Sequence, residues 1–341
     1  MSVFVSGASG FIAQHIVHQL LEQNYRVIGS VRSQEKADHL SKLFNNPNLS
    51  FVIVKDIAQP GSFDEAFKTH GKEIKYVLHT ASPFHYDVTD VEKELLIPAR
   101  NGTLGILESI KKYAADTVER VVVTSSYAAI MDLSKFGDAN TTFTEADWNP
   151  DTWETSKKDP LVGYCGSKKI AEEAAWKFLE ENKDKVKFKL ATVNPVFVFG
   201  PQMFDESVKG KLNTSCEIIN SAIRNGPDAE LAPVFGQYID VRDVAKAHLL
   251  AFQREDTIGK RLLMSEGDFN TQDIVNQLNA DFPVLKGKIP VGNPAEGVNG
   301  KKAIAQADNS KTKALLGFKF RSLKETVDDT AAQILKHEGM M

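Results

Sequence analysis

A tyrosine and a lysine four positions apart form the first pair in this chain whose chemistry can be named. In "YCGSK", Tyr164 and Lys168 share one face if the segment is helical. A free tyrosine has a pKa of about 10, but a nearby ammonium stabilises the phenolate and lowers that pKa. The pair could therefore donate a proton to a substrate oxygen. The same spacing also arises by chance, and amphipathic packing is then the usual cause.

A second candidate group stands earlier in the chain, after the apolar run "VVVT". This run is typical of a strand, and it ends in Ser125 and Ser126. In an open parallel sheet, ligands bind at the carboxyl ends of the strands. A serine hydroxyl at that edge could hold a carbonyl oxygen while Tyr164 gives the oxygen a proton.

The elements that must position these groups begin with "SVFVS" at residues 2–6, which predicts a buried strand. "GASGFIA" follows, and apolar residues at a helical period come next. In a doubly wound sheet this first turn faces a dinucleotide pyrophosphate, because glycines admit the backbone and the helix start offers free N–H groups. The spacing is G-x-x-G-x-x-A, ending at Ala13, rather than the commoner G-x-G-x-x-G, and a chance turn is the alternative. The expected cofactor contacts are Gly7, Ser9, Gly10, Phe11 and Ile12.

The end of the second predicted strand, at residues 26–31, indicates which dinucleotide binds. NAD sites place an acidic residue there for the ribose 2′-hydroxyl, whereas NADP sites place an arginine nearby. "GSVRSQEK" has no acid before Arg32, and Lys36 follows it. A guanidinium binds phosphate through two parallel hydrogen bonds and lysine adds a point charge, so we expect NADPH or NADP as the cofactor. A solvated pair of surface cations is the alternative.

Short apolar strands alternate with helical segments along most of the chain. The predicted strands are 2–6, 26–31, 49–54, 76–81, 120–126 and 188–200, and the main predicted helices are 34–44, 60–70, 90–114 and 162–182. This alternation predicts an α/β fold with a doubly wound parallel sheet. We expect residues 1–200 to form a dinucleotide-binding domain, completed by about 235–265. Residues 201–234 and 266–341 would form a smaller, mostly helical substrate lobe.

Composition narrows the functional classes. The 341 residues carry a formal net charge of −4 without clustered basic residues, which argues against nucleic acid as a partner. No apolar run is long enough to cross a bilayer, and the first residues do not resemble a signal peptide. Cys165, Cys216 and the eight histidines show no metal or disulfide spacing. We expect a cytoplasmic protein without a metal, acting as a monomer or a homodimer on a small molecule.

Taken in order, the motifs "GASGFIA", "TSSYA", "YCGSK", "NPVFVFGP" and "YIDVRDVA", together with Arg32, resemble those of the extended short-chain dehydrogenase/reductases. The chain is most similar to the dihydroflavonol-reductase-like branch, which includes fungal NADPH-dependent methylglyoxal, isovaleraldehyde and other carbonyl reductases. The resemblance covers essentially the whole chain. It implies a Rossmann fold, NADPH, and reduction of aldehydes, α-dicarbonyls and ketones to alcohols.

The resemblance also implies roles for individual residues. Ser126 would be the catalytic serine and Tyr164 the proton donor, while Lys168 would hold the nicotinamide ribose and lower the tyrosine pKa. The asparagine that the family often uses in a proton relay has no clear counterpart here. Further implied cofactor contacts are Asp56 and Ile57 at the adenine, Thr80, Ala81 and Ser82 beside the middle of the cofactor, Pro195 and Val198 at the nicotinamide, and Ser215 on the phosphate side.

Candidate substrate contacts each follow a motif that would face the nicotinamide. They are Phe84, Tyr127, Val162 and Phe197. An apolar lining suits hydrophobic carbonyl compounds, although each of these side chains could equally be core packing.

Two other functions share this fold. A nucleotide-sugar epimerase or dehydratase would keep the Tyr–Lys pair, but epimerases usually bind NAD, which fits an acid at the position of Arg32. Dehydratases usually carry acidic residues directly after the catalytic serine or threonine, where this chain has Tyr127. A non-catalytic NADP-sensing protein would often lack the tyrosine or the lysine, and this chain has both.

Overall fold

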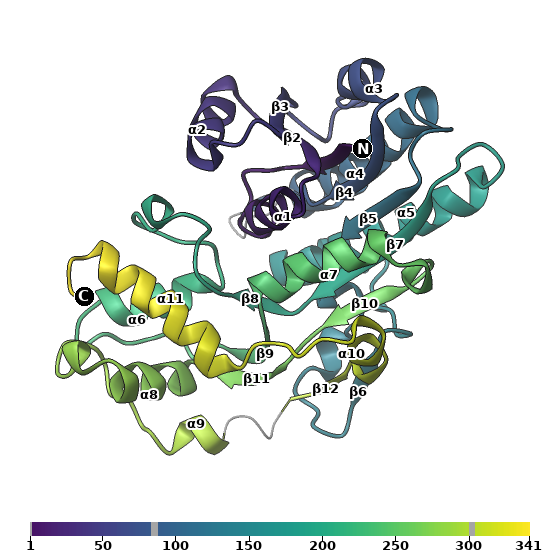
Figure 1. Cartoon of the computed structure of the whole chain (residues 1–341). Coiled ribbons are helices and arrows are strands. Elements are labelled where there is room, and N and C mark those ends of the chain that lie inside the picture. Colours follow the sequence, from purple (N-terminus) through teal and green to yellow (C-terminus); the bar gives the residue numbers. More distant parts are fainter. Residues whose placement is uncertain (1, 83–87, 300–303) are drawn as a thin grey trace.

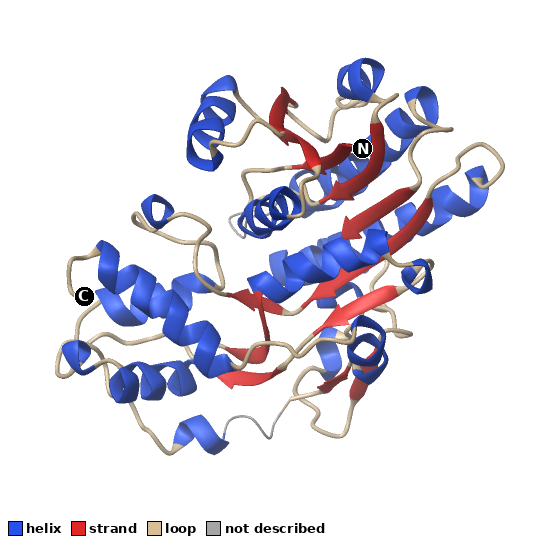
Figure 2. Ribbon diagram, viewed as in Figure 1, coloured by secondary structure: helices blue, strands red, loops and turns tan. Residues whose placement is uncertain are grey.

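A parallel sheet between two layers of helices forms the larger part of the computed structural model, which describes residues 2–82, 88–299 and 304–341 (Figures 1 and 2). Its seven strands pair in the order β10-β7-β5-β4-β1-β2-β3, always in parallel. They are β1 (Ser2–Ser6), β2 (Arg26–Val31), β3 (Leu49–Ile53), β4 (Ile74–His79), β5 (Arg120–Thr124), β7 (Lys189–Pro195) and β10 (Arg261–Met264). The strand order reverses between β1 and β4, which confirms the predicted doubly wound Rossmann fold.

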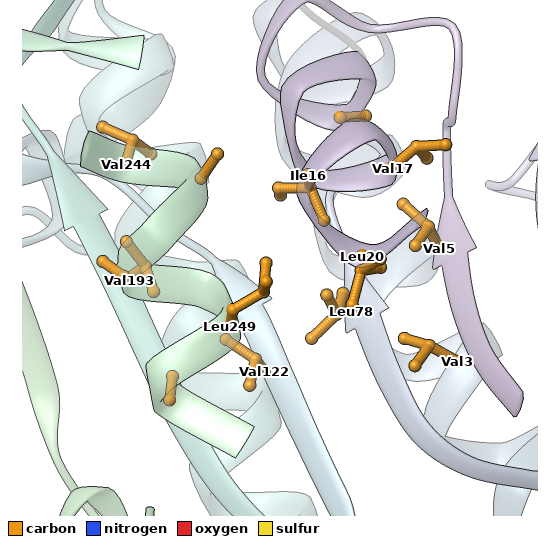
Figure 3. Close-up of a cluster of buried hydrophobic side chains, with 14 of the residues drawn as sticks. Val3, Val5, Ile16, Val17, Leu20, Leu78, Val122, Val193, Val244 and Leu249 are labelled. Atoms are coloured by element: carbon orange, nitrogen blue, oxygen red, sulfur yellow. The ribbon is translucent and has the colours of Figure 1, made fainter. Parts of the chain in front are cut away.

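Alternation along each strand sends side chains into two separate cores. Val3 and Val5 of β1 belong to one core with helices α1, α2 and α7, and Figure 3 shows both valines beside Leu20 of α1. Phe4, between them, packs with α3, α4 and α5 on the other face. These helices are α1 (Phe11–Glu22), α2 (Gln34–Phe44), α3 (Asp64–His70), α4 (Ile97–Tyr113), α5 (Pro160–Asn182) and α7 (Val241–Gln253). Burial on both faces fixes the carboxyl ends of the strands, where the candidate site lies.

Two predicted helices differ from those in the structure. Helix α3 begins at Asp64 instead of Pro60, because Gly61 has a φ of +73°, which a right-handed helix does not contain. The segment predicted as one helix over 90–114 starts with a π-helical turn, η1 (Glu92–Leu96), before α4. Pro98 in the first turn of α4 has no N–H to donate, which is compatible with this irregular start.

A smaller lobe is built on a second sheet, with strand order β11-β9-β8. Its strands are β8 (Phe197–Phe199), β9 (Phe235–Asp240) and β11 (Gly267–Asn270), and its main helices are α6 (Cys216–Arg224), α8 (Thr271–Asp281) and α11 (Leu323–His337). These elements share one buried core. The sequence analysis placed β8 and β9 with the Rossmann sheet, but both pair in the smaller sheet. From the range 235–265, it is β10 and α7 that pack with the large sheet.

The remaining elements are short. Strand β6 (Thr142–Thr144) pairs in parallel with β12 (Gln306–Asp308), and α9 (Glu296–Asn299) and α10 (Ser310–Leu316) lie in the C-terminal part of the chain. Within the described ranges, no helix combines the length and the apolar character needed to cross a membrane.

Candidate active site

The turn between β1 and α1 presents bare backbone at the carboxyl edge of the sheet. Gly7 has a φ of +65°, and a Cβ at this position would lie 3.0 Å from the Cα of Ala81. Gly10 is the N-cap of α1 and provides no side-chain cap, and the first helical turn holds no acidic residue. The positive end of the helix dipole therefore stays uncompensated, and Phe11 and Ile12 start the helix at this point. Ser9 in the same turn accepts a hydrogen bond at its backbone oxygen from Gln14 Nε2, at 2.9 Å.

The hydroxyl of Ser6 ties this turn to the end of β4. Ser6 Oγ accepts hydrogen bonds from the N–H groups of Thr80 and Ala81, at 3.0 and 3.1 Å. It also lies 2.9 Å from Nδ1 of His79. Burial lowers the pKa of His79 to about 4, so its ring is neutral near pH 7. The loop predicted to run beside the cofactor is thus held against the glycine turn.

Two exposed cations follow β2 at the same edge. Arg32 comes directly after the last residue of β2, and Lys36 lies in the first turn of α2, whose N-cap is Ser33. Within the described ranges, neither side chain has an ion-pair or hydrogen-bond partner. Both charges therefore remain available to an anionic group placed at the end of β2.

The predicted adenine-side residues lie after β3. Asp56 is exposed, and its carboxylate accepts hydrogen bonds from Ala58 N and Gln59 Nε2, at 2.9 and 3.1 Å. Ile57 packs against α4, where a Cβ on Gly102 would lie 2.9 Å from its Cδ1. The carboxylate thus stabilises its own turn, and the apolar side chain anchors that turn to the helix.

The tyrosine and the lysine lie near the start of α5, a helix capped by Asp159. Lys168 Nζ is 5.7 Å from the centroid of the Tyr164 ring and donates a hydrogen bond to Ser82 Oγ at 3.0 Å. Burial lowers the pKa of Lys168 to about 8, so its ammonium still predominates at pH 7. Gly166 between them permits close packing, since a Cβ there would overlap Ser156 Oγ at 1.8 Å. The arrangement places a positive charge beside the phenol.

The two serines after β5 have different partners. Ser125 is buried and its hydroxyl donates to the carboxylate of Glu172. Ser126 is half-buried, and its Oγ accepts the N–H of Ala128 at 3.1 Å. Its hydroxyl hydrogen has no acceptor within the part of the chain that the structure describes. This difference favours Ser126 over Ser125 as the donor to a substrate.

The residues predicted at the nicotinamide, Pro195 and Val198, the predicted phosphate-side residue Ser215 and two of the predicted substrate contacts lie on β7, β8, α5 and before α6. Pro195 ends β7, Val198 is buried in β8, and Ser215 directly precedes α6. Phe197 is half-buried, with its ring 5.4 Å from that of Phe269 in an edge-on contact. Val162 is half-buried in the first turn of α5.

The side chain of Tyr127 is buried, whereas a side chain that contacts substrate needs an accessible surface. Its side chain packs with Ile130 and Phe143, and its hydroxyl is buried without a partner among the described residues. Burial raises the pKa of this phenol above its ordinary value. Phe84, the fourth candidate substrate contact, lies outside the described residues.

The sequence pattern of the NAD dependent epimerase/dehydratase family matches residues 3–265. The chain belongs to this family. This confirms the likeness to the extended short-chain dehydrogenase/reductases. The NADPH-dependent methylglyoxal reductase of Saccharomyces cerevisiae is 63% identical over 340 residues, and the match covers 99% of each chain.

Solved structures of other members resemble the chain throughout. The yeast methylglyoxal/isovaleraldehyde reductase complexed with NADPH is 62% identical, with a TM-score of 0.97 over 100% of both chains. A Candida albicans relative, also in complex with NADPH, is 51% identical, with a TM-score of 0.95 over 99% of both chains.

The family's nucleotide site is matched by this chain's own geometry. Gly7 has no Cβ, which would otherwise lie against Ala81, so the backbone of the turn is open to a ligand. The start of α1 has no side-chain cap, so its N–H groups are suited to a pyrophosphate. Cys165 and Cys216 are buried, and burial raises the pKa of each thiol to about 12, which disfavours the reactive thiolate near pH 7. No cluster of three metal-ligating side chains occurs in residues 2–82, 88–299 and 304–341.

The sequence analysis missed Glu172, one helical turn beyond Lys168. Its buried carboxylate accepts the hydroxyl of Ser125 and pairs with Arg261. One signal was available, because an acidic residue on the same helical face as the Tyr–Lys pair must find a partner wherever that face is buried.

Proposed function

We propose that this chain is an NADPH-dependent carbonyl reductase that converts aldehydes, α-dicarbonyls and ketones to alcohols. The observation that carries the proposal is the Tyr164–Lys168 pair on α5, whose lysine bonds Ser82 beyond β4, while Ser126 follows the end of β5 at the same edge of the sheet. Identity of 63% to an NADPH-dependent methylglyoxal reductase supports the same cofactor and substrate class.

The three side chains divide the work on the carbonyl group. Bound NADPH would supply the hydride that reaches the carbonyl carbon. The hydroxyls of Ser126 and Tyr164 donate hydrogen bonds to the carbonyl oxygen, and they stabilise the transition state more than the ground state because negative charge grows on that oxygen. Tyr164 then transfers its proton, and the Lys168 ammonium stabilises the phenolate that remains.

Lys168 has a second role in this proposal, as the residue that holds the nicotinamide ribose. Its bond to Ser82 Oγ keeps Nζ at the carboxyl edge of the sheet. Loss of this one side chain should therefore affect both proton transfer and cofactor binding.

Substrate selection is assigned to Phe84, Val162 and Phe197, whereas the buried Tyr127 would act only through its packing. These side chains are bulky and mostly apolar, which favours medium-sized apolar aldehydes, α-dicarbonyls and aryl ketones over sugar nucleotides. Cys165 and Cys216 are free thiols, which supports a location in a reducing compartment, and we assign the protein to the cytoplasm. We expect it to act as a monomer or a homodimer.

Arg32→Ala should raise the KM for NADPH by roughly 10-fold and leave the KM for NADH nearly unchanged. A hydrogen bond to a charged group is worth roughly 1.5–3 kcal/mol, and exposure of Arg32 favours the lower end. Steady-state kinetics with each cofactor measure the effect. Lys42→Ala, which removes another exposed cation from α2, is the control and should change neither KM. An equal loss with both cofactors would make Arg32 a structural residue.

A substrate panel tests the proposed function. Purified protein is mixed with NADPH and, in turn, isovaleraldehyde, methylglyoxal, an aryl ketone and a UDP-sugar. We expect NADPH absorbance to fall with the simple carbonyl compounds and the matching alcohols to form. Conversion of the UDP-sugar alone, without net NADPH consumption, would identify an epimerase instead. Binding of NADPH without turnover of any carbonyl would identify a sensor.

A further inference from the structure

A buried carboxylate on α5 joins several elements around the candidate site. Glu172 lies one turn beyond Lys168, and its side chain is 0% exposed. Its two oxygens lie within hydrogen-bond distance of five side chains on α5, β7, β10 and the exit of β5, namely Ser125, Trp176, Thr192, Asn194 and Arg261. An ionised carboxylate can accept about four such bonds at ideal geometry, so this group is fully engaged.

Asn194 carries the contact from Glu172 to the turn that holds Ser126. Asn194 Nδ2 lies 2.7 Å from Glu172 Oε2 and 3.2 Å from the backbone oxygen of Ser126. The neighbouring Ser125 donates its hydroxyl to the same Oε2. Glu172 therefore holds the serine turn at two points, and it does so from the helix that carries Tyr164 and Lys168.

Arg261 neutralises the buried charge and extends the network. Its Nε donates to Glu172 Oε1, and its Nη2 lies 3.3 Å from Oε2. Its remaining N–H groups donate to backbone oxygens of the segment 129–147, and its guanidinium lies 3.8 Å from the ring centroid of Trp148. A buried ion pair is a weak contributor to stability but, when fully hydrogen-bonded, it is well suited to holding one geometry.

We propose that Glu172 is a positioning residue that sets the distance between the Ser126 hydroxyl and the Tyr164–Lys168 pair. The inference rests on the proposed function for the roles of those three residues. Reacting groups must be held within about 0.5 Å of their productive geometry. A carboxylate that links the serine turn directly to the helix of the proton donor provides this constraint.

Glu172→Gln keeps the shape of the side chain and removes its charge. We expect kcat for isovaleraldehyde to fall by about 10–100-fold, since a misplacement of about 1 Å can cost about that much. NADPH affinity, measured by fluorescence titration, should stay unchanged because Glu172 contacts neither the glycine turn nor Arg32. Glu173→Gln is the matched control, because Glu173 is the next residue on α5 and forms a surface pair with Lys169 at 3.0 Å. It should behave as the wild type.

A double-mutant cycle separates positioning from a general loss of structure. In the Ser126→Ala background, Glu172→Gln should lower kcat by no more than about twofold, because the hydroxyl that it positions is already absent. The same 10–100-fold loss in both backgrounds would overturn the proposal, as would a wild-type kcat for Glu172→Gln alone.

Two further experiments keep the proposal testable if Glu172→Gln does not fold or if the wild type has no reductase activity. If Glu172→Gln does not fold, Ser125→Ala is the second variant. It removes one hydrogen bond to Glu172 and leaves the ion pair with Arg261 intact. It should lower kcat in the wild-type background but not in the Ser126→Ala background. If the wild type reduces no carbonyl, the proposed function fails by itself. Crystal structures of the wild type and of whichever variant is soluble, Glu172→Gln or Ser125→Ala, then decide the positioning role. A difference between the two structures in the distance from Ser126 Oγ to the Tyr164 hydroxyl supports it, and an unchanged distance refutes it.

Discussion

Tyr164→Phe should lower kcat for carbonyl reduction by about 10²–10⁴-fold, the usual contribution of a positioned general acid. The substitution keeps the ring beside Lys168 and removes only the hydroxyl. NADPH binding should be retained, because the glycine turn and Arg32 are untouched. Steady-state kinetics with isovaleraldehyde and a fluorescence titration with NADPH measure the two quantities.

Tyr25→Phe is the matched control for this substitution. Tyr25 precedes β2 at the amino edge of the sheet, where its hydroxyl accepts a hydrogen bond from Gln253 Nε2 at 3.1 Å. Its loss should leave kcat unchanged. Wild-type kcat in Tyr164→Phe would remove the tyrosine from the mechanism.

Lys168→Met should damage both kcat and cofactor affinity, with kcat lower by about 10²-fold, the scale on which preorganised charge acts. One ammonium stabilises the phenolate and, in our proposal, holds the nicotinamide ribose. Lys169→Met is the control, since Lys169 pairs with Glu173 on another face of α5. A loss confined to kcat would leave the ribose contact unsupported.

The same lysine predicts a pH dependence. Burial lowers the pKa of Lys168 to about 8, so its positive charge is present below that pH and is lost above it. We therefore expect kcat/KM for reduction to decline as the pH rises through about 8. In Lys168→Arg the decline should move to higher pH, because a guanidinium stays charged. An unchanged pH profile of kcat/KM would show that the titration of another group causes the decline at high pH.

Local patterns were sufficient to predict the Rossmann sheet and the Tyr–Lys pair. The strand at 2–6 and the helix after it show their periods within a few residues, and Tyr164 and Lys168 are related by helical spacing alone. The positions of Arg32 and Lys36 follow from the predicted end of one strand, β2. Each of these features depends on neighbours along the chain.

Features that depend on distant partners could not be predicted in this way. Strand β8 is apolar like those of the large sheet and β9 has a mixed composition, and nothing in the residues of either strand specifies which sheet it joins. The contacts of Glu172 reach Asn194, Ser125 and Arg261, at sequence separations of 22, 47 and 89 residues. Such a network becomes visible only when the strands are placed side by side.

Transfer of deuterium from NADPH labelled at nicotinamide C4 tests the central claim most directly. Labelled NADPH is incubated with the wild-type protein and isovaleraldehyde, and the alcohol is analysed by mass spectrometry and NMR. Our account predicts one deuterium on the former carbonyl carbon when the transferred position carries the label, and a hydroxyl proton that exchanges with solvent. No labelled alcohol from either C4 epimer, together with conversion of a UDP-sugar at constant NADPH, would contradict the account.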